Sequence, residues 1–212
     1  MQKNKDLYNL NKEHKEMKIK IPPNLNQEET KCFNELVKPQ LEELYSYSYD
    51  NFEFDHIRIS ISKDKFPDNI LKPSLEEIKN FLSKIPEKHL EFVSKIYFVS
   101  YHCKDDNHKE IKGRTLPIIY DVLVFPKVKE KLNIILAHEI GHIVFEKCLT
   151  IKSIRNFTKA LSRTFPNVRF NSREELNHFI KEQFADCYDN FINNPERLKE
   201  FPYIYNYFID DV

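Results

Sequence analysis

Apolar side chains follow helical spacing over most of the second half of the chain. In residues 128–148 they recur at steps of three and four, which predicts a buried helix. Residues 172–194 predict another helix, which opens at Ser172 as N-cap of a capping box. This helix is expected to end before Pro195, because proline cannot continue it.

The first half of the chain mixes strand and helix patterns. Alternating or continuous apolar runs predict three strands, at residues 52–61, 92–101 and 117–125. Helices are predicted at residues 26–45, with Pro39 as a kink or a restart, and at residues 74–85, with Ser74 and Glu77 as a capping box. Residues 1–20 are charged and predict an arm or a surface helix. Residues 103–115 are polar and predict a loop.

Composition limits the classes of protein to which the chain can belong. Its 212 residues allow one domain with a sizeable core, and 33 basic residues balance 33 acidic ones, so nothing favours nucleic acid as a partner. We expect no membrane span, because no apolar run reaches the necessary length. The four cysteines are widely spaced and predict free thiols, which weakly favours a reducing compartment. We expect a monomer.

One short motif on the first helix carries chemistry. Residues 138–142 read His-Glu-Ile-Gly-His, and side chains at i and i+4 of a helix share one face, so His138 and His142 can both bind one metal ion. Glu139 lies beside this pair and can take a proton from a water molecule that the metal acidifies. Gly141 is one of two glycines in the chain, and its place inside a helix predicts close approach of another segment.

A third metal ligand is needed, because catalytic zinc sites usually have three protein ligands and one open position. Glu182 is the best candidate, since it lies among apolar side chains on the second helix. Asp186 is four residues further on and can accept the spare N–H of a ligand histidine. The sequence therefore predicts Zn²⁺ bound by His138, His142 and Glu182, with Glu139 as general base and then acid.

At this point the sequence resembles a known family. The motif followed by Glu182 and Asp186 is the pattern of gluzincin metallopeptidases, and residues 128–208 look like the C-terminal part of the anthrax lethal factor-like peptidases, which include the Pro-Pro endopeptidases. The resemblance implies a zinc endopeptidase that acts on protein or peptide. It also implies a secreted or host-delivered enzyme, although residues 1–20 carry no visible signal peptide, which is equally consistent with a cytoplasmic protein.

The chain departs from that family at one position. The family has a tyrosine seven residues before the glutamate ligand, where it stabilises the oxyanion, and this chain has Glu175. His178, one helical turn before Glu182, is a substitute candidate for the catalytic donor. The remaining candidates are three tyrosines near the end of the chain, at Tyr203, Tyr205 and Tyr207.

The expected architecture is α+β and zincin-like, with a small sheet, an active-site helix and a helical C-terminal lobe. Residues 1–50 are expected to form an N-terminal helical arm. Residues 51–212 are expected to form the catalytic domain, with the sheet in 51–127 and the zinc-binding helices in 128–212. The strand at 117–125, or its neighbour, is expected at the sheet edge, where an extended substrate can pair with it.

Two other functions fit the same residues. An intracellular regulatory peptidase of the repressor-cleaving type carries the same histidine motif and a later acidic helix. A zinc-binding interaction module without turnover fits the missing tyrosine. Retention of Glu139 speaks against the second alternative, because binding alone needs no base.

Overall fold

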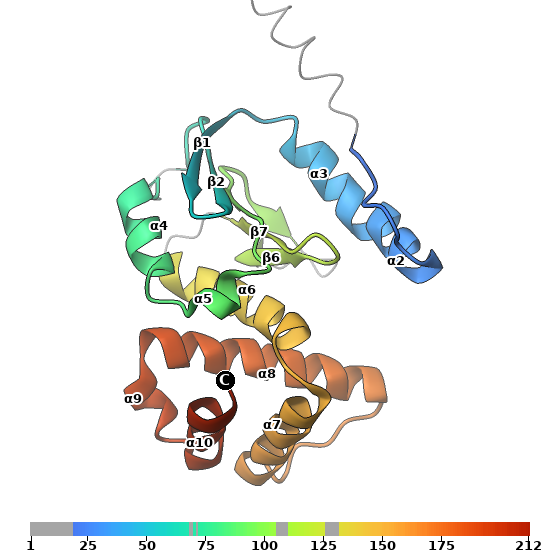
Figure 1. Cartoon of the computed structure of the whole chain (residues 1–212), viewed down its shortest axis with the longest axis vertical. Helices are drawn as coiled ribbons and strands as arrows, with labels where there is room; N and C mark the ends of the chain where they lie inside the picture. Colours follow the sequence, from blue (N-terminus) through green and yellow to red (C-terminus); the bar gives the residue numbers. More distant parts are fainter. Residues whose placement is uncertain (1–18, 68–69, 71, 105–109, 126–131) are drawn as a thin grey trace, which may run out of the picture.

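The computed structural model describes residues 19–67, 70, 72–104, 110–125 and 132–212 (Figure 1). The described residues of 19–125 form a sheet half and residues 132–212 form a helical half; the two lie one above the other, and helix α6 of the helical half lies next to the sheet. The prediction of a mixed α+β chain with a small sheet and a helical C-terminal part is confirmed. The predicted arm at residues 1–18 lies outside the described residues.

One five-stranded sheet forms the centre of the sheet half. Its spatial order is β1-β2-β3-β7-β6, with parallel pairing in β2-β3-β7 and antiparallel pairing at both outer pairs. The edge strand next to the helical half is therefore β6. The bounds of its strands are Tyr49–Phe54 (β1), Ile57–Ser62 (β2), Lys95–Phe98 (β3), Gly113–Leu116 (β6) and Asp121–Val124 (β7), and a separate ribbon joins Cys103–Lys104 (β4) to Glu110–Ile111 (β5).

Each face of the sheet packs against helices. One face, with Ile59, Phe98 and Val122, belongs to a core shared with α4 and α6. The opposite face, with Tyr97 and Leu123, packs against the N-terminal helical segment. Helices of this half have the bounds Gln27–Cys32 (α2), Lys38–Leu44 (α3), Leu75–Leu82 (α4) and Glu87–Leu90 (α5), and a π-helical turn, Phe33–Val37 (η2), joins α2 to α3.

The helical half is built around two long helices that pack side by side. These are α6 (Leu132–Lys147) and α8 (Arg173–Asn193). Buried aromatic rings of α8 pack against rings of α7 and α10. Phe184 is fully buried there, with Phe157 and Phe208 around it. The other helices are Ile151–Thr164 (α7), Pro195–Leu198 (α9) and Pro202–Asp211 (α10).

Of the two predicted capping boxes, the one at the start of α4 is confirmed and the one at the start of α8 is wrong. Ser74 and Glu77 form a reciprocal capping box at the start of α4. Ser172 caps α8 by accepting the N–H of Glu175, but the Glu175 carboxylate accepts from the Asn171 N–H rather than from Ser172. The helix predicted at residues 128–148 corresponds to α6, which begins at Leu132 in the structure; residues 128–131 lie outside the described residues.

The segment predicted as a helix at residues 26–45 is helical with an internal π turn. Pro39 lies in the first turn of α3, directly after this turn, as expected for a residue without an N–H. Phe33, Val37 and Leu41 are buried against the sheet, so this segment packs on the rest of the protein. The expected division after residue 50 falls inside β1.

The prediction of one strand at residues 52–61 was wrong. The structure has a hairpin, in which β1 and β2 pair and Asp55 lies at the turn with φ of 51°. Apolar positions occur at Phe52 and Phe54 and then at Ile57, so the alternation shifts by one residue at this turn. Aspartate tolerates a positive φ, which allows the reversal there.

Two predictions about the sheet edge also change. The strand predicted at residues 117–125 is shorter, and Pro117 to Tyr120 form a turn in which Ile118 and Tyr120 have positive φ. β7 lies inside the sheet, and the edge is its neighbour β6, which the prediction had named as the alternative. Three of the four residues of β6, Gly113–Leu116, fall in the segment 103–115 that was predicted to be a loop. β6 was missed because its residues, Gly-Arg-Thr-Leu, show no alternating apolar pattern.

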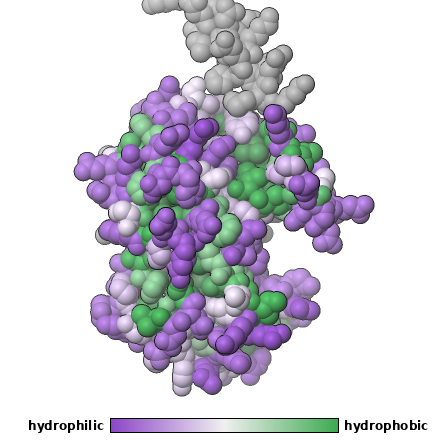
Figure 2. All heavy atoms as spheres, in the orientation of Figure 1, coloured by the Kyte–Doolittle hydropathy of each residue, from purple (hydrophilic) through white to green (hydrophobic). Residues whose placement is uncertain are grey.

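Hydrophilic side chains predominate on the face of the molecule seen in Figure 2, with apolar side chains in separate patches. None of the described helices is long and apolar enough to cross a membrane. All four cysteines are free thiols, as predicted.

Candidate metal centre

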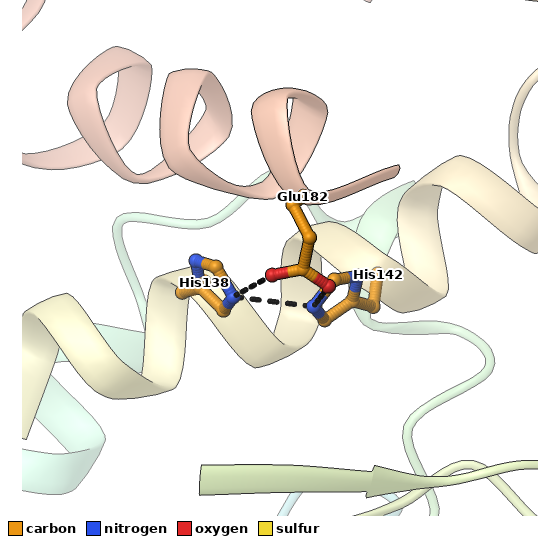
Figure 3. A group of neighbouring side chains, drawn as sticks. All are labelled: His138, His142 and Glu182. Carbon is orange, nitrogen blue, oxygen red and sulfur yellow. Dashed lines mark hydrogen bonds and ion pairs between the residues drawn. The ribbon is translucent and has the colours of Figure 1, made fainter. Parts of the chain in front are cut away.

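Helix α6 presents two histidines to one acidic side chain of α8. His138 and His142 are one turn apart on α6, and Glu182 reaches toward both rings from α8 (Figure 3). The Glu182 carboxylate lies 3.6 Å from the Nε2 atom of each histidine, through a different oxygen in each case. The two Nε2 atoms are 3.2 Å apart. These three residues could therefore hold a metal ion.

Asp186 orients His138 from one turn further along α8. Its carboxylate oxygen Oδ1 lies 2.9 Å from Nδ1 of His138 and accepts the hydrogen bond of that nitrogen. With Nδ1 held by the carboxylate, Nε2 is the nitrogen that faces Glu182 and His142. The structure thus brings Asp186 to the place that the sequence predicted.

The protonation of the two histidines differs in the metal-free cluster. Burial disfavours charge on His138, but hydrogen bonds to Asp186 and Glu182 outweigh it and raise the pKa of His138 to about 10. Burial and the neighbouring His138 lower the pKa of His142 to about 4. In the metal-free cluster near neutral pH, His138 is therefore the charged histidine and His142 the neutral one.

The Glu139 carboxylate lies against strand β6, beside the cluster and on the same cleft. It is 6% exposed, and burial raises the pKa of its carboxyl to about 7 although the nearby His138 opposes this. The Thr115 hydroxyl lies 3.0 Å from Glu139 Oε2 and 2.9 Å from the Glu139 carbonyl oxygen. A carboxyl group with such a pKa is suited to take and return a proton near neutral pH.

Gly141 is explained by helix packing. A Cβ atom at this position would lie 3.0 Å from Cα of Ala185 and 3.2 Å from Cβ of Tyr188, both on α8. The predicted close approach of another segment at Gly141 is confirmed. The absence of a side chain lets α8 come near enough for Glu182 to reach the histidines.

A cleft of about 550 Å³ opens beside the cluster. We call it the metal cleft: β5, the following residues 112–115 of which the last three belong to β6, and Pro117 form one wall, and α6 and α8 form the others. His138, His142 and Glu182 all line it, together with Glu139. Asp186 and Asp189 of α8 add negative charge to the same wall.

His178 lies outside the residues that line the metal cleft. Its side chain is 77% exposed, and Nδ1 is 3.9 Å from Oε1 of Glu182, so the ring lies near the ligand on the outer side of α8. The Glu175 carboxylate accepts a hydrogen bond from the Asn171 N–H at the start of α8. The structure therefore brings neither residue into the cleft.

The three C-terminal tyrosines also lie away from the cleft. The Tyr207 hydroxyl bonds to that of Ser153 inside the helical half, at 2.8 Å. Tyr203 packs under Arg163, and Tyr205 lies near Lys199. Across the described part of the chain, no tyrosine lines the metal cleft.

Sequence reasoning missed the role of strand β6. Thr115 bonds directly to Glu139, and a Cβ at Gly113 would lie only 2.6 Å from Glu139 Oε1. A glycine in a chain with only two of them was the available signal. Gly113 lies 25 residues before His138, and a separation of this length does not indicate that the two positions are in contact.

Comparison of the chain with models of known protein families gives no match. A search of curated protein sequences also gives none. The geometry of the cluster and the metal cleft therefore carries the functional argument.

Proposed function

We propose that the chain is a zinc-dependent endopeptidase with a zincin-like fold and the metal cleft as its active site. The observation that carries the proposal is the convergence of His138, His142 and Glu182 beside a buried Glu139, on a cleft bounded by a sheet edge. A protein or peptide is the proposed substrate. The resemblance of residues 128–208 to lethal factor-like peptidases supports the same assignment.

The donor atoms fit zinc in kind and in spacing. Two imidazole nitrogens and one carboxylate oxygen are a common ligand set of catalytic zinc. Ligands about 2.1 Å from a tetrahedral ion lie about 3.4 Å from one another. The observed separations are 3.2 Å between the two Nε2 atoms and 3.6 Å from each to Glu182. His138, His142 and Glu182 would hold the ion, and all three line the metal cleft.

When bound, zinc supplies Lewis acidity that polarises the scissile carbonyl and acidifies a water molecule. Glu139 takes one proton from the attacking water as the water oxygen bonds to the carbonyl carbon. Glu139 then gives this proton to the amide nitrogen as the C–N bond breaks, which yields a carboxylic acid and an amine. Asp186 keeps His138 oriented through its 2.9 Å hydrogen bond.

Strand β6 is suited to hold the substrate backbone. Its register with β7, together with the bond from Phe125 N–H to the Lys112 carbonyl, makes Arg114 and Leu116 the hydrogen-bonded partners of β7. The N–H and C=O groups of Gly113 and Thr115 consequently point to the free edge. An extended peptide paired there would run along the metal cleft past Glu139.

A second function is favoured by one specific observation. Hydrolysis through a tetrahedral intermediate usually has a donor for the oxyanion, and neither His178 nor a described tyrosine lines the metal cleft. A zinc-binding interaction module would need no such donor. The buried Glu139 and its hydrogen bond to Thr115 favour the peptidase, because a binding module gains nothing from a buried base.

The proposal is tested by loading the metal-free protein with Zn²⁺ and measuring metal content and peptide hydrolysis together. We expect one zinc per chain and hydrolysis that a strong chelator abolishes. Glu182→Ala should lose both, whereas Glu146→Ala, on the same cleft but outside the cluster, should keep its zinc. Stoichiometric zinc without hydrolysis of any peptide in a diverse library would support the binding module. Absence of zinc uptake would exclude both functions.

A further inference from the structure

Two residues of the edge strand contact the carboxylate of Glu139. Gly113 and Thr115 lie on the face of β6 that carries Val122 and Val124 on β7, and this face packs against α6. Thr115 bonds to Oε2 and to the main-chain carbonyl of Glu139, so it contacts both the side chain and its helix. One threonine thus joins the sheet edge to α6 at the position of Glu139.

Gly113 provides the space for the other carboxylate oxygen. A Cβ there would lie 2.6 Å from Oε1, 2.7 Å from Cγ and 2.9 Å from Cδ of Glu139. Gly113 has no positive φ, so its backbone conformation is open to any residue. The lack of a side chain is therefore required by Glu139 and not by the strand.

We propose that Thr115 and Gly113 are positioning residues that fix the orientation of the Glu139 carboxylate. Thr115 holds Oε2, and Gly113 lets Oε1 lie against the strand whose backbone would carry the substrate. Glu139 is 6% exposed, so the two contacts replace most of the solvent that would otherwise surround the carboxylate. This inference rests on the proposed peptidase function for its effect on turnover, but the orientation itself can be observed without turnover.

The hydrogen bond is tested by Thr115→Val against Thr115→Ser in the zinc-loaded protein. Valine has the shape and the strand preference of threonine but no hydroxyl. We expect kcat to fall about 10–100-fold in Thr115→Val, the range for one lost hydrogen bond to a charged group, with KM and zinc content unchanged. Thr115→Ser should stay within about threefold of the wild type. Thr164→Val is the matched control, because this hydroxyl donates to a helix carbonyl on α7 and does not line the metal cleft.

Crystal structures of the same variants give a readout that needs no activity. Glu139 should keep its carboxylate in place in Thr115→Ser and turn away from residue 115 in Thr115→Val. Gly113→Ala should displace the carboxylate without removing the hydroxyl. A Glu139 that keeps its position in both Thr115→Val and Gly113→Ala overturns the inference, whether or not the wild type hydrolyses peptides.

Turnover separates the two proposals. Wild-type hydrolysis that Thr115→Val leaves unchanged contradicts the positioning role and leaves the peptidase intact. A displaced carboxylate in a protein that hydrolyses no peptide supports the positioning role and contradicts the peptidase. If Thr115→Val does not fold, Gly113→Ala and Thr115→Ser decide the question by the position of Glu139.

Discussion

Removing the carboxylate of Asp186 should weaken zinc binding by a modest and calculable factor. Asp186→Ala takes away the 2.9 Å hydrogen bond that fixes the ring of His138. Loss of a partner of this kind costs about 10–100-fold in metal affinity. The Asp186 side chain is 58% exposed, so water can replace part of the bond. We therefore expect the low end, about a tenfold rise in Kd or about 1.4 kcal/mol.

Asp189→Ala is the matched control. Asp189 lies on the same helix and on the same cleft, but its carboxylate accepts from Asn193 at 2.7 Å and is partly buried. If only negative charge on the cleft mattered, removing either carboxylate would weaken zinc binding. If the hydrogen bond to His138 matters, Asp189→Ala should change Kd less than about threefold.

The assay is competition for Zn²⁺ with a fluorescent chelator, at one pH and one ionic strength for all variants. Asp186→Asn should fall between the wild type and Asp186→Ala, since an amide oxygen still accepts a hydrogen bond. Equal losses in Asp186→Ala and Asp189→Ala would refute the hydrogen-bond explanation. An unchanged Kd in Asp186→Ala would show that His138 needs no orienting partner.

Three further predictions follow from other contacts. Gly141→Ala should lower the free energy of unfolding measured in urea and weaken zinc binding, because the added Cβ would lie 3.0 Å from the Ala185 backbone. Overpacking of this kind costs about 1–3 kcal/mol, which exceeds the gain of about 1 kcal/mol in helix propensity. A variant more stable than the wild type would contradict this. Zinc binding at pH 7 should release about one proton, since the pKa of His138 is about 10 in the metal-free cluster, and zinc affinity should rise with pH. Calorimetry in two buffers of different ionisation enthalpy measures the number of protons released, and a value of zero would contradict the prediction. Burial lowers the pKa of His89 to about 4, whereas the unfolded value is about 6.5, so the unfolded chain binds the proton first. The free energy of unfolding should therefore fall between pH 7 and pH 5, by roughly 2 kcal/mol or less. His89→Gln should reduce this loss in urea unfolding at the two pH values, and an equal loss in both proteins would count against the prediction.

The members of the cluster could be predicted from sequence because the two helices that carry them are defined by residues close together in the chain. Residues 138–142 place two histidines on one helical face at any position in the fold, and Ser172 with Pro195 defines the ends of the helix that carries Glu182. The capped ends and the buried face of each helix depend on residues within a few turns. Only the meeting of α6 and α8 needed tertiary contact, and Gly141 signalled it.

The sheet edge was harder to predict because its residues serve the site rather than the core. β6 carries Gly113 and Thr115 on the face toward α6, where an ordinary strand would carry large apolar side chains. Its periodicity is therefore weak, and residues 103–115 resembled a loop. In β1 and β2 the alternation of apolar and polar residues shifts by one residue between Phe54 and Ile57, which is where the turn lies. The prediction of a single strand ignored this shift.

The predicted donor role of His178 or a C-terminal tyrosine could not be judged from sequence, because such a role depends on which side chains enter the cleft. His178 shares a helical face with Glu182 by spacing, yet its ring is 77% exposed. Tyr207 is buried, but its hydroxyl is directed to Ser153 on α7. Helical spacing gives the face of a residue, whereas the direction of a long side chain depends on its neighbours.

Glu139→Gln gives the most direct test of the proposed peptidase. Glutamine has nearly the shape of glutamate and can still meet Thr115, but it cannot take a proton from water. Zinc content, thermal stability and hydrolysis of a peptide library should be measured on the zinc-loaded wild type and variant side by side. We expect one zinc per chain in both proteins, cleavage by the wild type and loss of nearly all turnover in Glu139→Gln. A variant that cleaves at the wild-type rate with its zinc in place would contradict the account.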